Sequence, residues 1–352
     1  MVNTLDLAPI PDVDAALVER HTEVRRQLAD QLATADDVSL RVFRHVQHRL
    51  ISEHLARIDP VAADVPELLV PPKRRLLSSP ERLRLQGCAA ALNHIDVRLT
   101  MVKMGLAPGV LEHETPMVLN ALVEAPAPSG DETNAGIVRA KASGFAPGGS
   151  AFRPPPPERC RPLLRAAIEM AAEADVPGVV RAGWLLGAVF AIHPFADGNG
   201  RTGRLMLHAL LSEAAPVGFD WGTPVALTQN RAGYQAAAQA YNPSLTAYDA
   251  AKLDPRPLIE FVAESGIEGD LQAGARLAAI RTVVDAAISS GLDEPAAALL
   301  VAVAADRNSS LDELGSAGDA VTEGVMALVA AGRLGWDERG KLQVVGPNPF
   351  LI

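Results

Sequence analysis

The sequence predicts a mainly α-helical protein of more than one domain, and its length, composition and hydrophobic spacing all point that way. The chain has 352 residues, whereas an ordinary domain has roughly 150. Hydrophobic residues make up 48% of the chain but aromatic residues only 4%, and alanine-rich stretches supply much of the apolar content. Because alanine favours helices and strands prefer β-branched and aromatic residues, we expect packed helices.

Charge, hydropathy and cysteine content exclude several functional classes. The formal charge of −10 gives no overall attraction to nucleic acid or anionic membranes. The first twenty residues carry three aspartates and no basic leader, so they do not resemble a secretory signal. The longest apolar run, residues 295–305, is far shorter than the roughly 20 residues that span a bilayer. Cys88 and Cys160 are distant and form no CxxC pair, so we expect reduced thiols in a cytoplasmic protein.

Residues 1–120 are expected to form a helical N-terminal region. Apolar residues recur at helical spacing over residues 12–58. A second helix is expected to open at Ser79, with Pro80 at its first helical position, and to run towards Met104. Three histidines in the first of these helices lack an HExxH motif or an acidic partner at ligand spacing, so we expect solvated side chains and no metal site: His45, His48 and His54.

The middle of the chain is expected to hold a helical core with one small hairpin. Residues 125–135 are loop by composition, and residues 136–152 suggest a β-hairpin around a Pro-Gly-Gly turn. Pro154–Pro157 is read as a stiff surface connector. Five helices are then expected, over 162–174, 181–192, from about 200, over 231–241 and over 257–264. The helix at 181–192 is apolar nearly all round, which is typical of a central core helix.

The chain changes character after Gly269. Helical residues 271–289 precede short helical patterns and a final hairpin at 333–345, an order that resembles a winged helix-turn-helix. A transcription regulator is therefore an alternative function. However, residues 306–346 contain four basic and seven acidic residues, and residues 320–331 contain neither Lys nor Arg. A helix that reads DNA needs these cations, so the pattern favours a protein-binding or dimerisation module.

The residues with the clearest chemistry lie in one stretch, His193–Arg204, with the sequence HPFADGNGRTGR. A Gly-Asn-Gly turn runs into a helix there, so free backbone N–H groups and the positive end of the helix dipole point at one spot. Arg201 and Arg204 are three residues apart and leave the same face of the first turn. Amides and two guanidinium groups together match a polyphosphate.

Two further residues complete the stretch. Asp197 is its lone carboxylate, and the natural partner of such a group among phosphates is a hard cation such as Mg²⁺. His193 follows a buried helix and adjoins the anion site, where an imidazole can accept a proton from an incoming hydroxyl. The stretch therefore contains the parts of a phosphoryl- or nucleotidyl-transfer site.

These residues match the signature HxFx(D/E)GNGRxxR at every position, and the chain resembles the Fic family. That family consists mainly of AMP transferases that modify hydroxyl groups of proteins. The resemblance extends more weakly to the hairpin, the proline connector and two later helices, and covers roughly residues 121–266. It implies a Fic catalytic core at 121–268 with a β-hairpin flap. This core would follow the helical region 1–120 and precede the winged-helix-like module at 269–352 that the C-terminal pattern suggests.

The resemblance also implies a role for each matched residue. His193 would be the general base towards a Tyr, Ser or Thr hydroxyl of a target protein, and Asp197 would hold Mg²⁺ against the phosphates of ATP. Phe195 would pack into the core. The implied nucleotide-binding residues are Asp197, Gly198, Asn199, Gly200, Arg201 and Arg204. The implied target-binding residues of the flap, which would pair with the target by strand addition, are Phe145, Gly148, Gly149 and Phe152.

The resemblance leaves several points open. Some relatives use another nucleotide, transfer another phosphate-containing group or remove AMP, although the intact GNGR sequence favours ATP. Self-modification and a homodimer stay open, whereas DNA and membrane partners are not expected. Many relatives carry a second motif, (S/T)xxxE(G/N), whose glutamate blocks the last arginine of the signature, here Arg204. No Glu-Gly or Glu-Asn pair here fits it, and Asp96 is the nearest substitute. We therefore expect no built-in glutamate lock.

Overall fold

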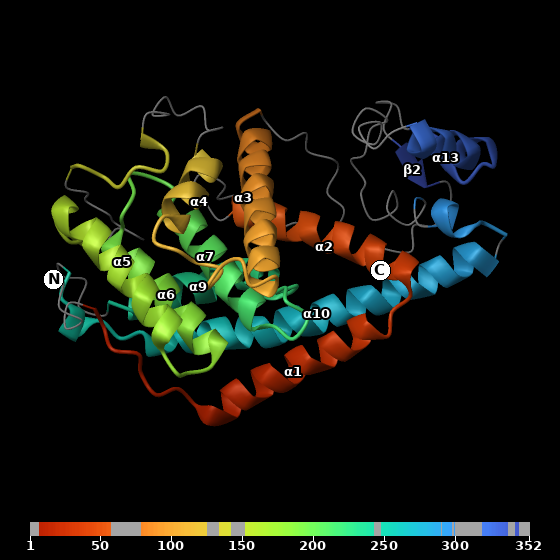
Figure 1. Cartoon of the computed structure of the whole chain (residues 1–352). Helices are drawn as coiled ribbons and strands as arrows, with labels where there is room; N and C mark the ends of the chain where they lie inside the picture. The colour runs from red at the N-terminus through yellow and green to blue at the C-terminus, as the bar shows by residue number, and fades with distance from the viewer. Residues whose placement is uncertain are drawn as a thin grey trace. The chain divides into compact units, whose positions relative to one another are not determined.

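A computed structural model describes residues 7–57, 79–124, 134–141, 152–242, 248–289, 291–297, 299, 319–336 and 342–344. The described elements are helices apart from two short strands near the C-terminus, which confirms the mainly α-helical fold class (Figure 1). The chain divides into two compact units. Unit 1 comprises Met1–Gln27, Ile51–Ala63 and Leu77–Leu271, and unit 2 comprises Leu28–Leu50, Asp64–Leu76 and Gln272–Ile352. None of the helices in the described ranges is long and apolar enough to cross a membrane.

Three long helices make up the N-terminal region, as expected: α1 (Ala15–Ala33), α2 (Asp37–Arg57) and α3 (Ser79–Lys103). Carboxylates of two residues just before the helices cap α1 and α2, since Asp14 accepts from the Ala16 N–H at 2.9 Å and Asp36 from the Ser39 N–H at 2.8 Å. The start of α3 at a Ser-Pro pair follows the sequence prediction.

The core of unit 1 is built around α6. Its four principal helices are α4 (Thr115–Glu124), α5 (Pro157–Glu173), α6 (Gly178–Ile192) and α7 (Asn199–Ala214). Helix α6 packs against α5 and α7, and α4 packs against α3 and α7. Twelve of the fifteen residues of α6 are buried, which confirms its central position. The fully buried Trp184 donates from its indole N–H to the Ala8 carbonyl at 3.0 Å, so α6 also fixes the N-terminal segment.

The structure corrects two expectations that rested on proline and glycine. Pro155 is buried and Pro157 is the first residue of α5, whereas Pro156 is exposed, so the proline run lies only partly at the surface and opens a helix. The helices expected at 257–264 and 271–289 are one helix, α10 (Arg256–Ser289). Gly269 lies inside this helix without breaking it. Glycine is needed there for close packing, because a Cβ would lie 2.3 Å from the backbone of Gly222. Helices α8 (Thr223–Gln229) and α9 (Arg231–Ala240) precede it.

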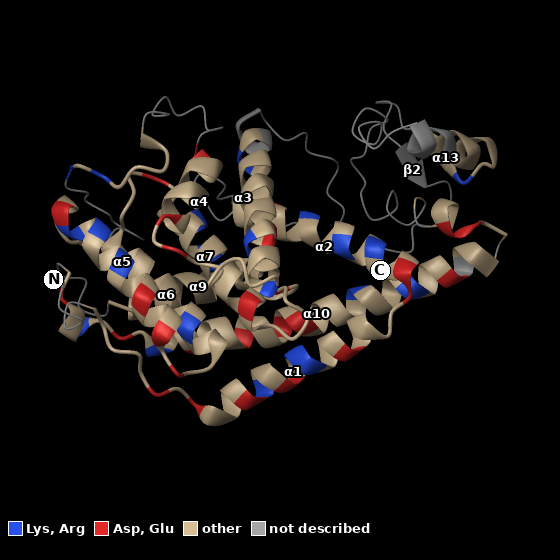
Figure 2. Ribbon diagram, viewed as in Figure 1, with Lys and Arg blue, Asp and Glu red and all other residues tan. Residues whose placement is uncertain are grey.

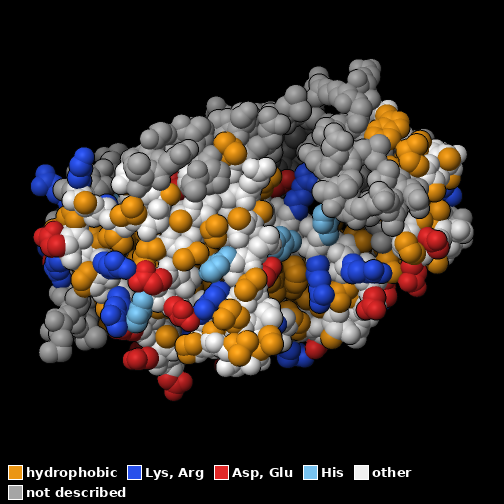
Figure 3. Space-filling view, turned by 45° about the horizontal axis from the view of Figure 1, so that its top comes forward, with side chains coloured by type: hydrophobic (Ala, Val, Ile, Leu, Met, Phe, Trp, Pro, Cys, Tyr) orange, Lys and Arg blue, Asp and Glu red, His pale blue; other side chains and the backbone are white. Residues whose placement is uncertain are grey.

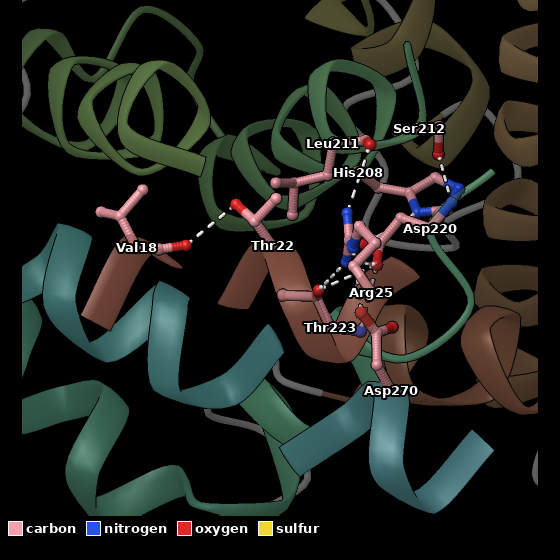
Figure 4. A network of polar contacts seen from close by, with 9 residues as sticks. All are labelled: Val18, Thr22, Arg25, His208, Leu211, Ser212, Asp220, Thr223 and Asp270. Atoms are coloured by element: carbon pink, nitrogen blue, oxygen red, sulfur yellow. Dashed lines mark hydrogen bonds and ion pairs between the residues drawn. The ribbon is translucent and has the colours of Figure 1, made fainter. Parts of the chain in front are cut away.

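A buried polar network joins four helices of unit 1 (Figure 4). Arg25 of α1 donates to Asp220 at 2.6 Å and to Asp270 of α10 at 2.9 Å, and all three residues are at most 7% exposed. Thr223 donates to Asp220 at 2.8 Å, and a ring nitrogen of His208 lies 3.6 Å from the same carboxylate. This network ties α1, α7, the start of α8 and α10 together.

One cation does not balance two buried carboxylates equally. Burial acts to raise the pKa of Asp220, but the charge of Arg25 and the contacts with His208 and Thr223 outweigh it and hold that pKa well below its ordinary value. Burial raises the pKa of Asp270 to about 6, against the effect of Arg25 and with the charge of Asp220 adding to the rise. Asp220 and Asp270 share one guanidinium, and only the pKa of Asp270 is raised, so Asp270 is the carboxylate that ionises less readily.

The C-terminal part of unit 2 ends in a helix and a two-stranded ribbon. Helix α13 (Asp319–Ala330) is followed by β1 (Leu334–Trp336) and β2 (Leu342–Val344), which pair antiparallel with Gly335 opposite Gln343. A small core of Val325, Leu328 and Leu334 holds them together. The two strands confirm the predicted hairpin. Residues 300–318, which hold part of the expected short helical patterns, lie outside the described residues. The winged-helix fold and the three domain boundaries stay predictions.

Charges of both signs occur side by side on several described helices. Figure 2 shows Lys and Arg interspersed with Asp and Glu along α1 and α10. The same mixture appears on the face drawn in Figure 3, where basic and acidic side chains lie next to one another among hydrophobic ones. Helix α13 contains neither Lys nor Arg. These described elements therefore offer no purely basic face to nucleic acid in these views.

Candidate active site

Two hydrogen bonds from the side chain of Asn199 hold the loop between α6 and α7. The amide oxygen accepts from the Phe195 N–H at 2.8 Å, and the amide nitrogen donates to the Phe195 carbonyl at 2.9 Å. Phe195 itself is fully buried, as expected. Because both the side chain and the backbone of Phe195 are fixed, the loop has a defined path between the two helices.

His193 stands where α6 ends, in an unusual backbone conformation. It adopts φ 48° and ψ 60°, and among the described residues no other non-glycine residue has a positive φ. Its N–H still donates to the Val189 carbonyl at 2.9 Å. The side chain is 8% exposed, and burial together with the nearby Arg139 cation lowers its pKa from 6.5 to about 4. The imidazole is therefore neutral near pH 7 and able to accept a proton.

The start of α7 has the geometry of an anion site. Gly198 precedes the helix at φ 76°, and a Cβ there would lie 2.3 Å from a carboxylate oxygen of Glu124, so glycine is required twice over. No side chain caps α7 among the described residues, since the N-cap residue is Gly198 and the Asn199 side chain is bonded to Phe195. The first N–H groups of the helix and its dipole are therefore directed at one place.

The two arginines of α7 differ in their partners. Both are buried, with Arg201 4% and Arg204 3% exposed. Arg201 lies 2.9 Å from Glu124 and 3.6 Å from Asp197, so it already has counter-charges. Arg204 donates to the Leu55 carbonyl at 3.4 Å, its Nε has no hydrogen-bond partner, and no carboxylate pairs with it among the described residues. A buried cation without a counter-charge is costly, so this position favours an anionic ligand.

The Asp197 carboxylate is suited to bind a metal ion that is also coordinated by the phosphates of a bound substrate. Its side chain is 68% exposed, while the Gly198 N–H donates to it at 2.6 Å and orients one oxygen. No group of three or more His, Cys, Asp or Glu in the described part of the chain could hold a metal ion. Mg²⁺ commonly takes one or two carboxylates, with waters and substrate phosphates filling its other positions. A single oriented carboxylate suits such an ion.

Sequence reasoning missed two residues of α4 that support this loop. Asn120, which is fully buried, donates to the Asp197 carbonyl at 3.0 Å and accepts from the Gly136 N–H at 2.9 Å. Glu124, one turn later, pairs with Arg201. Two polar residues four apart on the buried face of an apolar helix were the signal, because such groups are seldom buried without a partner.

The predicted flap residues lie mostly outside the described residues. This applies to Phe145, Gly148 and Gly149, whereas Phe152 is described and is 6% exposed. Its side chain is thus buried, and its role in target binding stays a prediction. The preceding segment does approach the loop, since Val138 forms an antiparallel bridge with Phe195.

Comparison with known proteins agrees with this geometry. Residues 120–211, which run from within α4 through α5, α6 and the loop into α7, match the model of the Fic/DOC family. The chain contains a Fic domain. Over 66 residues it is 39% identical to a probable protein adenylyltransferase of Aquifex aeolicus, a match that covers 18% of this chain and 21% of that protein. The chain therefore matches only about a fifth of the length of this curated relative.

Solved Fic structures share the fold over a larger part of the chain. A Fic family protein from Desulfovibrio desulfuricans G20 superposes with a TM-score of 0.57 at 16% identity, over 96% of this chain and 98% of that one. Fic-1 from C. elegans gives a TM-score of 0.54 at 19% identity, over 75% of this chain and 72% of that one. A Fic domain containing signaling protein from Bacteroides thetaiotaomicron gives 0.52 at 17% identity, over 72% and 98%. At these identities the likeness concerns the fold.

Proposed function

We propose that this protein is an adenylyltransferase that moves AMP from ATP to a hydroxyl group of a target protein. The observation that carries the proposal is the juxtaposition of a neutral, buried His193 with an anion site in which Arg204 pairs with no carboxylate of the described residues. The A. aeolicus relative, named a probable protein adenylyltransferase, supports the same activity.

The site residues divide the reaction between them. The N–H groups of the first turn of α7 bind the phosphates of ATP, and Arg204 binds the γ-phosphate as the missing counter-charge. The target hydroxyl oxygen bonds to the α-phosphorus while the bond from that phosphorus to the bridging oxygen of pyrophosphate breaks. His193 accepts the hydroxyl proton. Mg²⁺ held by Asp197 would neutralise charge on the phosphates.

Asp197→Ala is expected to lower Mg²⁺-dependent transfer by at least about tenfold, because the ion loses its carboxylate ligand. Rates should be measured across a Mg²⁺ titration. Asp175→Ala, in the exposed turn before α6, serves as the control and should follow the wild-type curve. Identical curves for Asp197→Ala and the wild type would remove the metal assignment.

Asp96→Gly is expected to change self-labelling with ATP by less than about tenfold, which corresponds to about 1.4 kcal/mol. The reason is that Arg204 forms no ion pair with Asp96, so no lock is released by the substitution. A rise of about tenfold or more would show that Asp96 acts as the inhibitory carboxylate after all.

The proposal is tested by incubating the protein with ATP, Mg²⁺ and cell lysate, followed by mass spectrometry of modified proteins. AMP on a Tyr, Ser or Thr side chain is the expected product, and the same spectra identify the target. Modification by another nucleotide or group, or loss of AMP from previously modified proteins, would replace this reaction with one of the alternative activities.

A further inference from the structure

We propose that Arg139 is a positioning residue, which fixes the main chain of His193 and supplies the positive charge beside its imidazole. The inference rests on the proposed function, in which His193 accepts the proton. Arg139 lies outside the signature stretch, and nothing in the sequence pattern predicts its role. Its side chain is 7% exposed, so the guanidinium is held inside the protein.

Arg139 is tied to the catalytic loop by two hydrogen bonds. Its Nε donates to the His193 carbonyl at 2.7 Å, and its backbone N–H donates to the Pro194 carbonyl at 2.9 Å. The neighbouring bridge between Val138 and Phe195 extends this pairing. Three consecutive residues of the loop are thus fixed by two residues of one segment.

This attachment matters because the backbone of His193 is strained. A φ of 48° is unfavourable in a non-glycine residue and persists only where the surroundings enforce it. The hydrogen bond from Arg139 holds the carbonyl that follows this strained angle. It therefore fixes the direction in which the chain leaves α6, and with it the place of the imidazole.

The remaining donors of Arg139 also go to carbonyl groups. Nη1 donates to Lys141 at 3.0 Å, and Nη2 donates to the Pro155 carbonyl. No carboxylate pairs with Arg139 among the described residues, so carbonyl dipoles hold the guanidinium without cancelling its charge. That uncancelled charge acts on the adjacent imidazole.

The other ionisable groups near His193 do not oppose this effect. From α5, the Cys160 thiol donates towards the Ile192 carbonyl at 3.7 Å, and burial raises its pKa, so it is neutral. Asp197, at the far side of the loop, is exposed to water. Burial and the Arg139 cation thus both favour the neutral imidazole.

Two substitutions separate the charge from the hydrogen bonds. Arg139→Met removes both, whereas Arg139→Lys keeps a cation but not the planar fork that reaches several carbonyls. Arg165→Met is the control, because Arg165 on α5 is 63% exposed and pairs only at the surface with Glu169. The pKa of His193 is measured by NMR, with its resonance assigned by its disappearance in His193→Gln, and transfer rates are measured from about pH 3 to 9, so that the acid limb falls inside the range.

In the wild type we expect His193 to titrate well below 6.5, at about 4. In Arg139→Met its pKa should rise by about 1, and the acid limb of the rate profile should move with it. In Arg139→Lys the pKa should stay low while kcat falls at least about tenfold at every pH, because the carbonyl is released. Arg165→Met should match the wild type in both measurements.

A wild-type His193 that titrates near 6.5 would overturn the proposal without any variant, even if Arg139→Met did not fold. An unchanged pKa in folded Arg139→Met, or wild-type kcat in Arg139→Lys, would overturn it as well. The NMR titration needs no activity. If the wild type transferred no AMP, the proposed function would fail while the charge effect of Arg139 would still be tested.

Discussion

His193→Ala is expected to lower the rate of AMP transfer about 10²–10⁴-fold while ATP affinity changes little. The imidazole adjoins the phosphate site but contributes no charge to it near pH 7, because burial keeps it neutral. Its removal therefore affects proton transfer and not ground-state binding. Transfer of labelled AMP gives the rate, and calorimetric titration with ATP gives the affinity.

The unusual backbone of His193 calls for a second variant. Asparagine adopts left-handed angles more readily than other non-glycine residues, so His193→Asn keeps the loop while removing the base. It should lose activity as His193→Ala does. His113→Ala is the matched control, since His113 is 40% exposed and pairs with Glu169 at 3.0 Å on the surface. Full transfer by either folded His193 variant would contradict the proposed mechanism.

Arg25→Met is expected to lower the free energy of unfolding by about 3–5 kcal/mol, because it leaves two buried carboxylates without their cation. Asp220 and Asp270 are the carboxylates concerned. Urea unfolding monitored by circular dichroism measures the loss. The adjacent Arg26→Met is the control: Arg26 is 57% exposed, pairs with Glu23 on the surface, and should cost about 0–1 kcal/mol. Equal losses for the two variants would show that the network adds no stability.

The same network gives stability a dependence on pH. The folded-state pKa of Asp270 is raised from 3.8 to about 6, so its stabilising contribution is complete below about pH 4 and is lost as the pH rises through 6. The pKa of Asp220 is lowered, so its contribution is present above about pH 4 and declines in stronger acid. Relative to Asp270→Asn, the wild type should therefore be less stable at pH 7 than at pH 4. The opposite trend in urea unfolding would contradict this assignment.

Short-range patterns were sufficient to predict the loop and the helices that carry it. The apolar residues of α6 and the Gly-Asn-Gly turn at the start of α7 lie in one short stretch of sequence. Their spacing alone therefore predicts a buried helix followed by a turn with free N–H groups. The same reasoning failed at Gly269, because glycine in a helix signals either a break or a close backbone approach, and only the packing partner distinguishes them.

The residues that support the site could not be predicted because their partners are distant or lie on the backbone. Arg139 donates to backbone carbonyl groups, which every residue has, so its partners cannot be identified from residue types. Glu124 meets Arg201 across 77 positions, and Arg25 meets Asp270 across 245. Such pairings depend on the packing of whole helices, which hydrophobic periodicity does not specify.

The position of a label on ATP tests the proposed function most directly. The protein is incubated with Mg²⁺ and lysate in two parallel reactions, one with ATP labelled at the α-phosphate and one with ATP labelled at the γ-phosphate. We expect that proteins acquire the α-label and not the γ-label, and that His193→Asn abolishes this transfer. Transfer of the γ-label to proteins would show phosphoryl transfer and contradict the proposed AMP transfer, as would the absence of label from both reactions.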